Sequence, residues 1–241
     1  MSTVALKPVV APRASEAIYE QIRGMILNGE LKPGDHLPSE RQMMEMMQRS
    51  RPTIREALRM LEREGFIKTS HGSTGAVIQA PTTSTLEQSF EAMLRVNRIT
   101  VREVGEYRDF NEIQIAGWAA ERRTEEDIKN LQQCLQKSAQ VIDNYLLFIE
   151  AEQPFHALLA KASQNTVAQI QERVLSSCVK QPLYDTFVEL SPDDRRALCE
   201  HIHRKHVAVV DAIIAQDVET ARQRMAIHVI PFISNDLIVL D

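Results

Sequence analysis

Residues 38–79 read PSERQMMEMMQRSRPTIREALRMLEREGFIKTSHGSTGAVIQ, and this stretch decides the fold of the first third of the chain. Ser39 is a good helix N-cap, and Gln42 three residues later completes a capping box, so the pattern predicts a helix over residues 40–48. A short turn, a second helix and a two-stranded hairpin follow one another directly in the sequence. This order is typical of a winged helix-turn-helix, and it indicates a protein that binds DNA.

The second predicted helix has Ser50 as its N-cap, Pro52 in its first turn and Gly65 after its end. Apolar residues repeat along one face in steps of three and four, at Ile54, Ala57, Leu58 and Leu61. Arginines repeat every four residues along another face, at Arg51, Arg55, Arg59 and Arg63. Guanidinium groups bind phosphates and can also bind guanine O6 and N7, which favours DNA recognition by this face. The alternative is a solvated face whose arginines pair with neighbouring glutamates.

The predicted hairpin consists of residues 66–69 and 76–79, which are rich in apolar and β-branched residues. Between them lies a small, polar tip that includes His71 and Gly72. Such a tip can approach a sugar-phosphate backbone or the minor groove closely, although an ordinary surface turn has the same composition.

Residues 14–80 resemble the N-terminal domain of the GntR family of bacterial transcription regulators, whose members share phrases like LPSER, SRxTxREAL and LExEGF. This chain has LPSER at residues 37–41, SRPTIREAL at residues 50–58 and LEREGF at residues 61–66. The resemblance implies that the base and phosphate contacts are made by Arg41, Ser50, Arg51, Thr53 and Arg55, with His71 and Gly72 at the wing tip.

Length and charge indicate a second domain of another kind. The winged helix uses about a third of the 241 residues, and residues 1–13 are expected to be a disordered lead without the apolar core of a signal peptide. Residues 1–80 hold 11 Lys and Arg against 9 Asp and Glu, a net charge of +2. Because the whole chain has a net charge of −5, residues 81–241 have a net charge of −7. We therefore expect a cytoplasmic protein with no membrane span, whose acidic part faces away from DNA.

The acidic part is predicted to be all-α. A Pro/Thr/Ser cluster at residues 81–85 reads as a linker, and residues 86–241 show helical periods with almost no strand signals. The pattern predicts a bundle of about seven helices, at residues 86–96, 101–122, 124–143, 145–163, 166–188, 191–215 and 218–237. The predicted fold class is thus mostly α, a winged helix-turn-helix followed by a helical bundle.

Histidine placement is the informative feature of this bundle, because five of the seven histidines lie between residues 156 and 228. Glu152 and His156 are four residues apart, which places them on one helix face, and His206 and His228 lie on successive helices. Three imidazoles and one carboxylate could hold a divalent metal ion. The alternative is a set of hydrogen-bonded packing histidines.

The bundle resembles the FadR-like branch of the GntR family, whose FCD-type helical domain binds ligands. Residues 152–165, EQPFHALLAKASQN, match the family phrase DxxFHxxLAxASGN, and two later histidines also agree. The resemblance implies a divalent ion, with Zn, Ni and Mn all plausible, bound by Glu152, His156, His206 and His228. Glu stands where the family usually has Asp, and Pro154 removes a helical hydrogen bond between the first two of these residues.

Residues 106–108, Glu-Tyr-Arg, resemble the family's ExR phrase, whose arginine lies in the effector cavity. By this resemblance Arg108 would bind one oxygen of a small carboxylate whose other oxygen is on the metal. The alternative is a surface arginine paired with Glu106 or Asp109.

These observations together predict a bacterial transcription regulator, a repressor rather than an enzyme, that binds a near-palindromic operator in double-stranded DNA as a homodimer. Its effector would be a small organic acid, bound in a helical domain that also dimerises. Two rival functions remain from the sequence. One is a metal-dependent hydrolase or lyase, because the same ligands could hold an activated water. The other is an architectural DNA binder without an effector.

Overall fold

The computed structural model describes residues 14–69, 75–80 and 82–233. Within these residues the chain forms eleven helices and one two-stranded sheet, which confirms the predicted fold class. The chain divides into two compact units, Met1–Thr85 and Leu86–Asp241. In the described part of the chain, no helix is long and apolar enough to cross a membrane.

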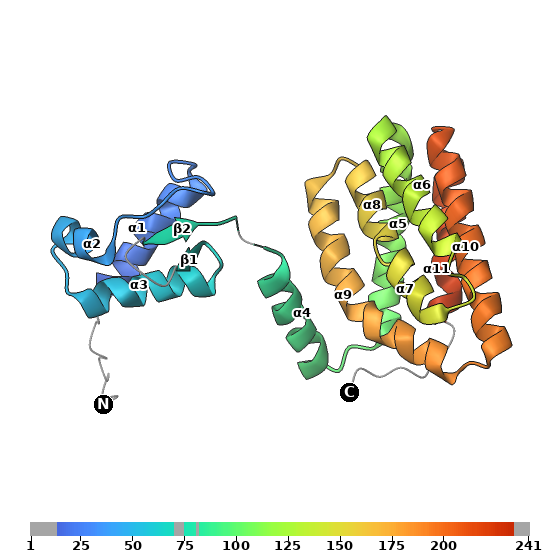
Figure 1. The fold of residues 1–241 in the computed structure, drawn as a ribbon, viewed down its shortest axis with the longest axis horizontal. Helices are drawn as coiled ribbons and strands as arrows, with labels where there is room; N and C mark the ends of the chain where they lie inside the picture. Colours follow the sequence, from blue (N-terminus) through green and yellow to red (C-terminus); the bar gives the residue numbers. More distant parts are fainter. Residues whose placement is uncertain (1–13, 70–74, 81, 234–241) are drawn as a thin grey trace, which may run out of the picture. The chain divides into compact units, whose positions relative to one another are not determined.

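The smaller unit is a winged helix-turn-helix (Figure 1). Its elements are α1 (Ala14–Leu27), α2 (Glu40–Met47), α3 (Arg51–Arg63), β1 (Ile67–Thr69) and β2 (Ala76–Ile78). The two strands are antiparallel, and α3 packs against both α1 and α2. The three helices thus share a core with the hairpin, as the order of the sequence patterns predicts.

Local capping sets the ends of α2 and α3. The Ser39 hydroxyl accepts a hydrogen bond from the Gln42 amide, and the Gln42 side chain accepts one from the Ser39 amide at 3.0 Å, which confirms the capping box. Gln48 ends α2 in the left-handed conformation at φ 52°. Ser50 occupies the N-cap position of α3, but its hydroxyl lies 2.9 Å from the Thr53 hydroxyl and does not cap the backbone.

The predicted apolar face of α3 is buried. Ile54, Ala57, Leu58 and Leu61 all lie in the core of the smaller unit. Gly75 leads into β2 at φ +76°, and a Cβ there would lie 2.8 Å from the Leu37 carbonyl oxygen. Only glycine fits this approach of the hairpin to the loop before α2.

The larger unit is entirely helical in its described part. Its helices are α4 (Ser84–Val96), α5 (Val101–Arg122), α6 (Glu125–Ala139), α7 (Tyr145–Glu152), α8 (Phe155–Ala162), α9 (Thr166–Glu189), α10 (Pro192–Ile214) and α11 (Val218–Ile233). The single helix predicted over residues 145–163 is wrong. Pro154 has no amide hydrogen to continue α7, and its carbonyl instead accepts the first bond of α8, from the Leu158 amide at 2.9 Å.

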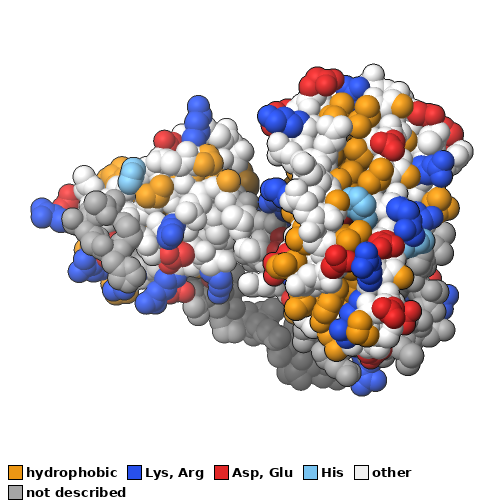
Figure 2. All heavy atoms as spheres, turned by 45° about the vertical axis from the view of Figure 1, so that its right-hand side comes forward, with side chains coloured by type: hydrophobic (Ala, Val, Ile, Leu, Met, Phe, Trp, Pro, Cys, Tyr) orange, Lys and Arg blue, Asp and Glu red, His pale blue; other side chains and the backbone are white. Residues whose placement is uncertain are grey.

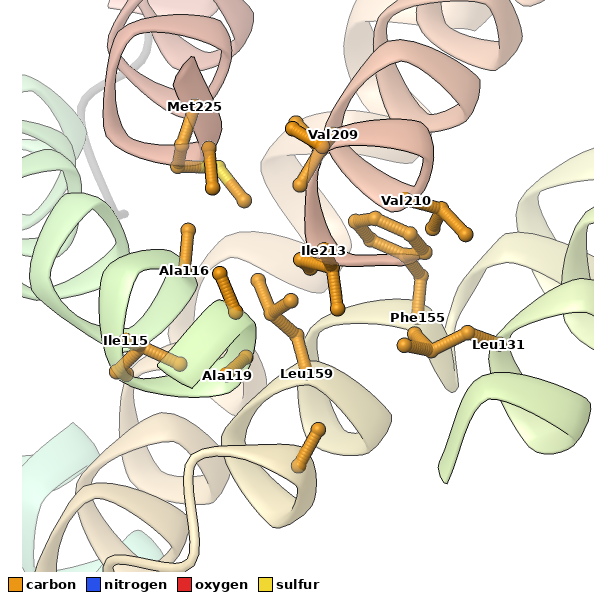
Figure 3. Packing of buried hydrophobic residues seen from close by; sticks show 14 of the residues in the cluster. Ile115, Ala116, Ala119, Leu131, Phe155, Leu159, Val209, Val210, Ile213 and Met225 are labelled. Carbon is orange, nitrogen blue, oxygen red and sulfur yellow. The ribbon is translucent and has the colours of Figure 1, made fainter. Parts of the chain in front are cut away.

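The core of the larger unit lies where α5, α8, α10 and α11 meet (Figure 3). Phe155 and Leu159 of α8 pack against Val209 and Ile213 of α10 and Met225 of α11, and all five side chains are fully buried. The small residues Ala116 and Ala119 of α5 face the same core, so that α5 packs closely against its neighbours. This packing fixes the four helices that carry most of the polar site described below.

Candidate DNA-binding surface and effector cavity

The arginine face of α3 is open to solvent, opposite the buried apolar face. The side chains of Arg51, Arg55 and Arg59 are 66%, 56% and 68% exposed. Figure 2 shows Lys and Arg side chains gathered along one edge of the smaller unit. A solvent-exposed row of guanidinium groups on the second helix of a helix-turn-helix has the position of a recognition surface.

The other predicted DNA contacts lie around this face. Arg41 is 87% exposed on α2, Ser50 is exposed at the start of α3, and Thr53 is half-buried in its first turn. His71 and Gly72 lie outside the described residues. The predicted residues that the structure describes therefore cluster at the junction of α2 and α3.

Glu40 is a member of this surface that the sequence patterns did not single out. Its carboxylate, at the first position of α2, lies 2.9 Å from Arg51 Nε and 3.7 Å from Arg55 Nε. One carboxylate thus forms ion pairs with two of the arginines that are predicted to contact bases. No local spacing reveals this contact, because it joins residues 11 and 15 positions apart on different helices.

Glu40→Gln is expected to weaken discrimination between operator and random DNA, because the amide orients the two guanidinium groups less strongly. The loss should stay below the about 1 to 3 kcal/mol of a deleted bidentate base contact. Affinity for random DNA should rise, since one negative charge leaves the surface. Fluorescence anisotropy with both DNAs measures the two changes. Glu56→Gln, which removes the charge beside Arg59, serves as control and should change the random-DNA affinity alone.

Three histidines come together in the larger unit. His156 of α8, His206 of α10 and His228 of α11 each place a ring nitrogen within 4.8 Å of the others. His206 Nε2 lies 3.0 Å from His228 Nε2, and the His156 ring centroid lies 5.4 Å from each of the other two. Convergent imidazoles from three helices are the donor set of a divalent transition-metal site.

Two carboxylates lie beside rings of this triad, each at an Nδ1 atom. Glu152 contacts His206 Nδ1, which is the ring nitrogen away from His228. Glu112 Oε1 lies 3.1 Å from His156 Nδ1. Glu152 was predicted as a fourth ligand, but in this arrangement it lies on the far side of the His206 ring. A carboxylate on the second nitrogen fixes the ring and leaves the first nitrogen free to bind a metal.

Burial favours the neutral form of two rings of the triad, His156 and His228. Burial lowers the pKa of His228 well below its usual value, and His206 and His156 act in the same direction. Burial also lowers the pKa of His156, although Glu112 opposes this effect. Burial acts to raise the pKa of Glu152, but His206 and His203 outweigh it and hold the pKa well below the usual range. Neutral imidazoles backed by a charged carboxylate can bind a cation.

Arg108 lies inside the bundle rather than on its surface. Its side chain is 14% exposed, with Nε 2.5 Å from Glu112 Oε1 and Nη2 3.8 Å from Glu172 Oε1. Burial acts to lower the pKa of Arg108, and the two glutamates more than offset it. The alternative of a surface arginine paired with Glu106 or Asp109 is therefore wrong, because Arg108 lies in a buried network with Glu112 and Glu172.

A cavity of about 430 Å³ joins these groups. The three histidines, Arg108 and the glutamates at positions 112, 152 and 172 line it, together with apolar side chains that include Phe148, Leu183, Phe187 and Ile202. In Figure 2, histidine side chains reach the surface of the larger unit where hydrophobic side chains gather. An apolar cavity with a few convergent polar groups is suited to a small ligand.

Comparisons with known proteins agree with this architecture. Residues 14–77 match the family model described as bacterial regulatory proteins, gntR family, and residues 103–230 match the FCD domain. Among curated proteins, the chain is 28% identical over 230 residues to the HTH-type transcriptional repressor NanR of Enterobacter sp. (strain 638), with 92% of this chain and 85% of that protein covered. NanR of Salmonella newport (strain SL254) is 28% identical over 229 residues, with the same coverage.

Among solved structures, Streptococcus agalactiae GntR superposes with a TM-score of 0.65 at 21% identity, covering 90% of this chain and 98% of that one. This likeness shows a common fold. The FCD match alone spans more than half of the chain and follows the gntR match along the sequence. The chain therefore belongs to the GntR family of transcription regulators, in the FadR-like group that carries an FCD effector-binding domain.

Proposed function

We propose that the protein is a cytoplasmic, ligand-responsive transcriptional repressor that binds a near-palindromic operator as a homodimer and senses a small carboxylate at a metal-assisted site. The observation that carries the proposal is a three-histidine cluster that lines a cavity, in a chain that also has an exposed arginine face on its recognition helix. The relatives that cover most of the chain are themselves named repressors.

The DNA half of the proposal depends on geometry. One recognition helix reads only a few base pairs, and two copies related by a two-fold axis read two half-sites in inverted order. In this proposal Arg41, Arg51 and Arg55 contact bases and phosphates, and Ser50 and Thr53 contact phosphates. The contact of Arg51 and Arg55 with Glu40 supports a common orientation of these two side chains.

In the cavity, His156, His206 and His228 would hold one divalent ion, with Zn, Ni and Mn as the best candidates for a nitrogen-rich donor set. When bound, such an ion supplies an open position for a carboxylate oxygen. Glu152 holds the His206 ring through Nδ1, and Glu112 lies 3.1 Å from His156 Nδ1. Glu152 could itself reach the ion only by giving up its contact with His206.

Arg108 is the proposed contact for the effector's second oxygen. Its Nη2 lies 3.8 Å from Glu172, longer than a hydrogen bond, so this end of the guanidinium can turn to a ligand while Nε stays with Glu112. An effector that prefers one arrangement of the helical units would then change the spacing of the two recognition helices. The strength of regulation is then given by the coupling free energy between the effector cavity and the DNA-binding surface.

Glu152→Gln tests the support of the triad. An amide cannot hold the His206 ring as a carboxylate does, so we expect metal affinity to fall about 10- to 100-fold, as is usual when a carboxylate behind a histidine ligand is removed. Competition with a chromophoric chelator measures the change. Glu150→Gln, an exposed position on the same helix, should bind metal like the wild type. Equal affinities for all three proteins would show that Glu152 does not support the site.

Selection of bound sequences from a random DNA pool tests the proposed function as a whole. The expected product is an inverted repeat with half-sites about one helical turn apart, and light scattering should show a dimer both free and on this DNA. Binding should weaken steeply with salt, because several arginines displace counterions from phosphates. A monomer on a single half-site would contradict the proposal.

A further inference from the structure

Two buried carboxylates in the cavity share a single guanidinium. Glu112 of α5 and Glu172 of α9 are each only 1% exposed, and Arg108 is the cation that contacts them. Among the residues that the structure describes, this part of the cavity therefore has two carboxyl groups beside one guanidinium.

The same carboxylates have oxygens without a partner. Arg108 and His156 both contact Glu112 Oε1, and the Ser176 hydroxyl donates to Glu172 Oε1. Within residues 14–69, 75–80 and 82–233, neither oxygen of Glu112 accepts a hydrogen bond of good geometry, and Glu172 Oε2 has no hydrogen-bond partner. Both residues line the cavity. Because buried carboxylate oxygens are costly to leave unpaired, this place calls for a donor from a ligand.

The separation of the two carboxylates suits an ammonium group. Glu112, Glu172 and His156 each have a ligating atom within 4.8 Å of those of the other two. A nitrogen between two oxygens at this spacing can donate a hydrogen bond of about 2.8 Å to each of them. A hydroxyl group could donate only one such bond and would leave the charge unbalanced.

We propose that Glu112 and Glu172 form an amine-binding subsite, so that the effector is a small zwitterion, an amino acid with an apolar side chain. This inference rests on the proposed function, because it assumes that the effector's carboxylate binds beside the histidines. His156 belongs to both groups of residues, which places the two subsites next to each other. Leu183, Phe187 and Ile202 supply an apolar wall for the side chain.

A second divalent ion is the competing occupant of this subsite. Arg108 Nε lies 2.5 Å from the Glu112 oxygen that such an ion would share, and a guanidinium repels a dication more strongly than a monovalent ammonium. The geometry therefore favours the amine. Metal stoichiometry distinguishes the two occupants.

The test is calorimetric titration of the metal-loaded full-length protein with two matched sets of probes. One set is leucine, 2-hydroxy-4-methylpentanoate and 4-methylpentanoate, and the other is phenylalanine, 3-phenyllactate and 3-phenylpropanoate. In each set only the group at C2 changes. We expect the amine of at least one set to bind roughly tenfold or more tighter than its hydroxy and unsubstituted partners, because a charge-assisted hydrogen bond exceeds a neutral one.

Glu172→Gln should abolish this preference, so that the amine and the hydroxy acid of a set bind alike, and Glu189→Gln at an exposed position of the same helix should retain it. The inference is overturned if no amine binds, if the hydroxy acids bind as tightly as the amines in the wild type, or if Glu172→Gln keeps the preference. It is also overturned if the wild type holds two ions per protomer and Glu172→Gln holds one. The wild-type comparison does not depend on how the variant folds. Failure of the proposed function would show separately, as absent metal or as DNA binding that no bound acid changes.

Discussion

Arg51→Ala and Arg55→Ala are each expected to abolish operator selectivity, at a cost of about 1 to 3 kcal/mol if the lost side chain is a bidentate base contact. Both side chains are more than half exposed and lie off the buried face of α3, so folding should be unaffected. Fluorescence anisotropy on operator and random DNA measures the effect, and thermal unfolding checks the fold.

Arg63→Ala is the matched control for these two variants. It removes the same charge from the same helix, but at the end of α3 away from α2. Its affinity should fall on both DNAs alike, as expected for a general electrostatic contribution. Wild-type binding by either Arg51→Ala or Arg55→Ala would show that α3 meets DNA by another face.

His206→Ala is expected to remove the metal ion. This ring is 2% exposed and lies between Glu152 and His228, so its loss removes one of the three imidazole ligands from the middle of the site. Elemental analysis after metal supplementation should find about one ion per protomer in the wild type and nearly none in the variant. His201→Ala, at a ring on the same helix outside the cluster, should keep the ion. Full occupancy in His206→Ala would exclude the triad as the site.

Acidification should release the same ion. Burial lowers the pKa values of His156 and His228 below the usual 6.5, so both rings are neutral at pH 7 and gain protons only in more acidic solution. Imidazole binds metal in its neutral form, and we expect the ion to be lost below about pH 6. The histidines of the triad lie in the larger unit and not on α3, so DNA binding should persist while the effector response disappears.

Much of the fold could be predicted because its signals are local. The Ser39 capping box and the apolar face of α3 each depend on residues within one or two helical turns, and both are present in the structure. The break at Pro154 also has a local cause, but the apolar pattern continues across it, so that a single helix was predicted where there are two.

In the candidate site, too, contacts within one helix could be predicted and contacts between helices could not. Arg108 and Glu112 are four residues apart on one helix, and this spacing could have indicated their ion pair. Glu172 reaches the pair from 60 residues further along the chain, and Glu40 reaches Arg51 from another helix. Such contacts come from the packing of helices, which no short-range pattern encodes. The proposed metal and effector residues line one cavity of the larger unit.

We expect ligand binding in the helical unit to control DNA binding by the winged helix. The most direct measurement is the affinity of the metal-loaded wild type for its selected inverted repeat, in the presence of each small acid or amino acid that raises its melting temperature. We expect at least one of these ligands to weaken DNA binding about 5- to 150-fold, the usual range of coupling between sites, and His206→Ala to show no such effect. A DNA affinity that stays the same with every ligand that binds would contradict this expectation.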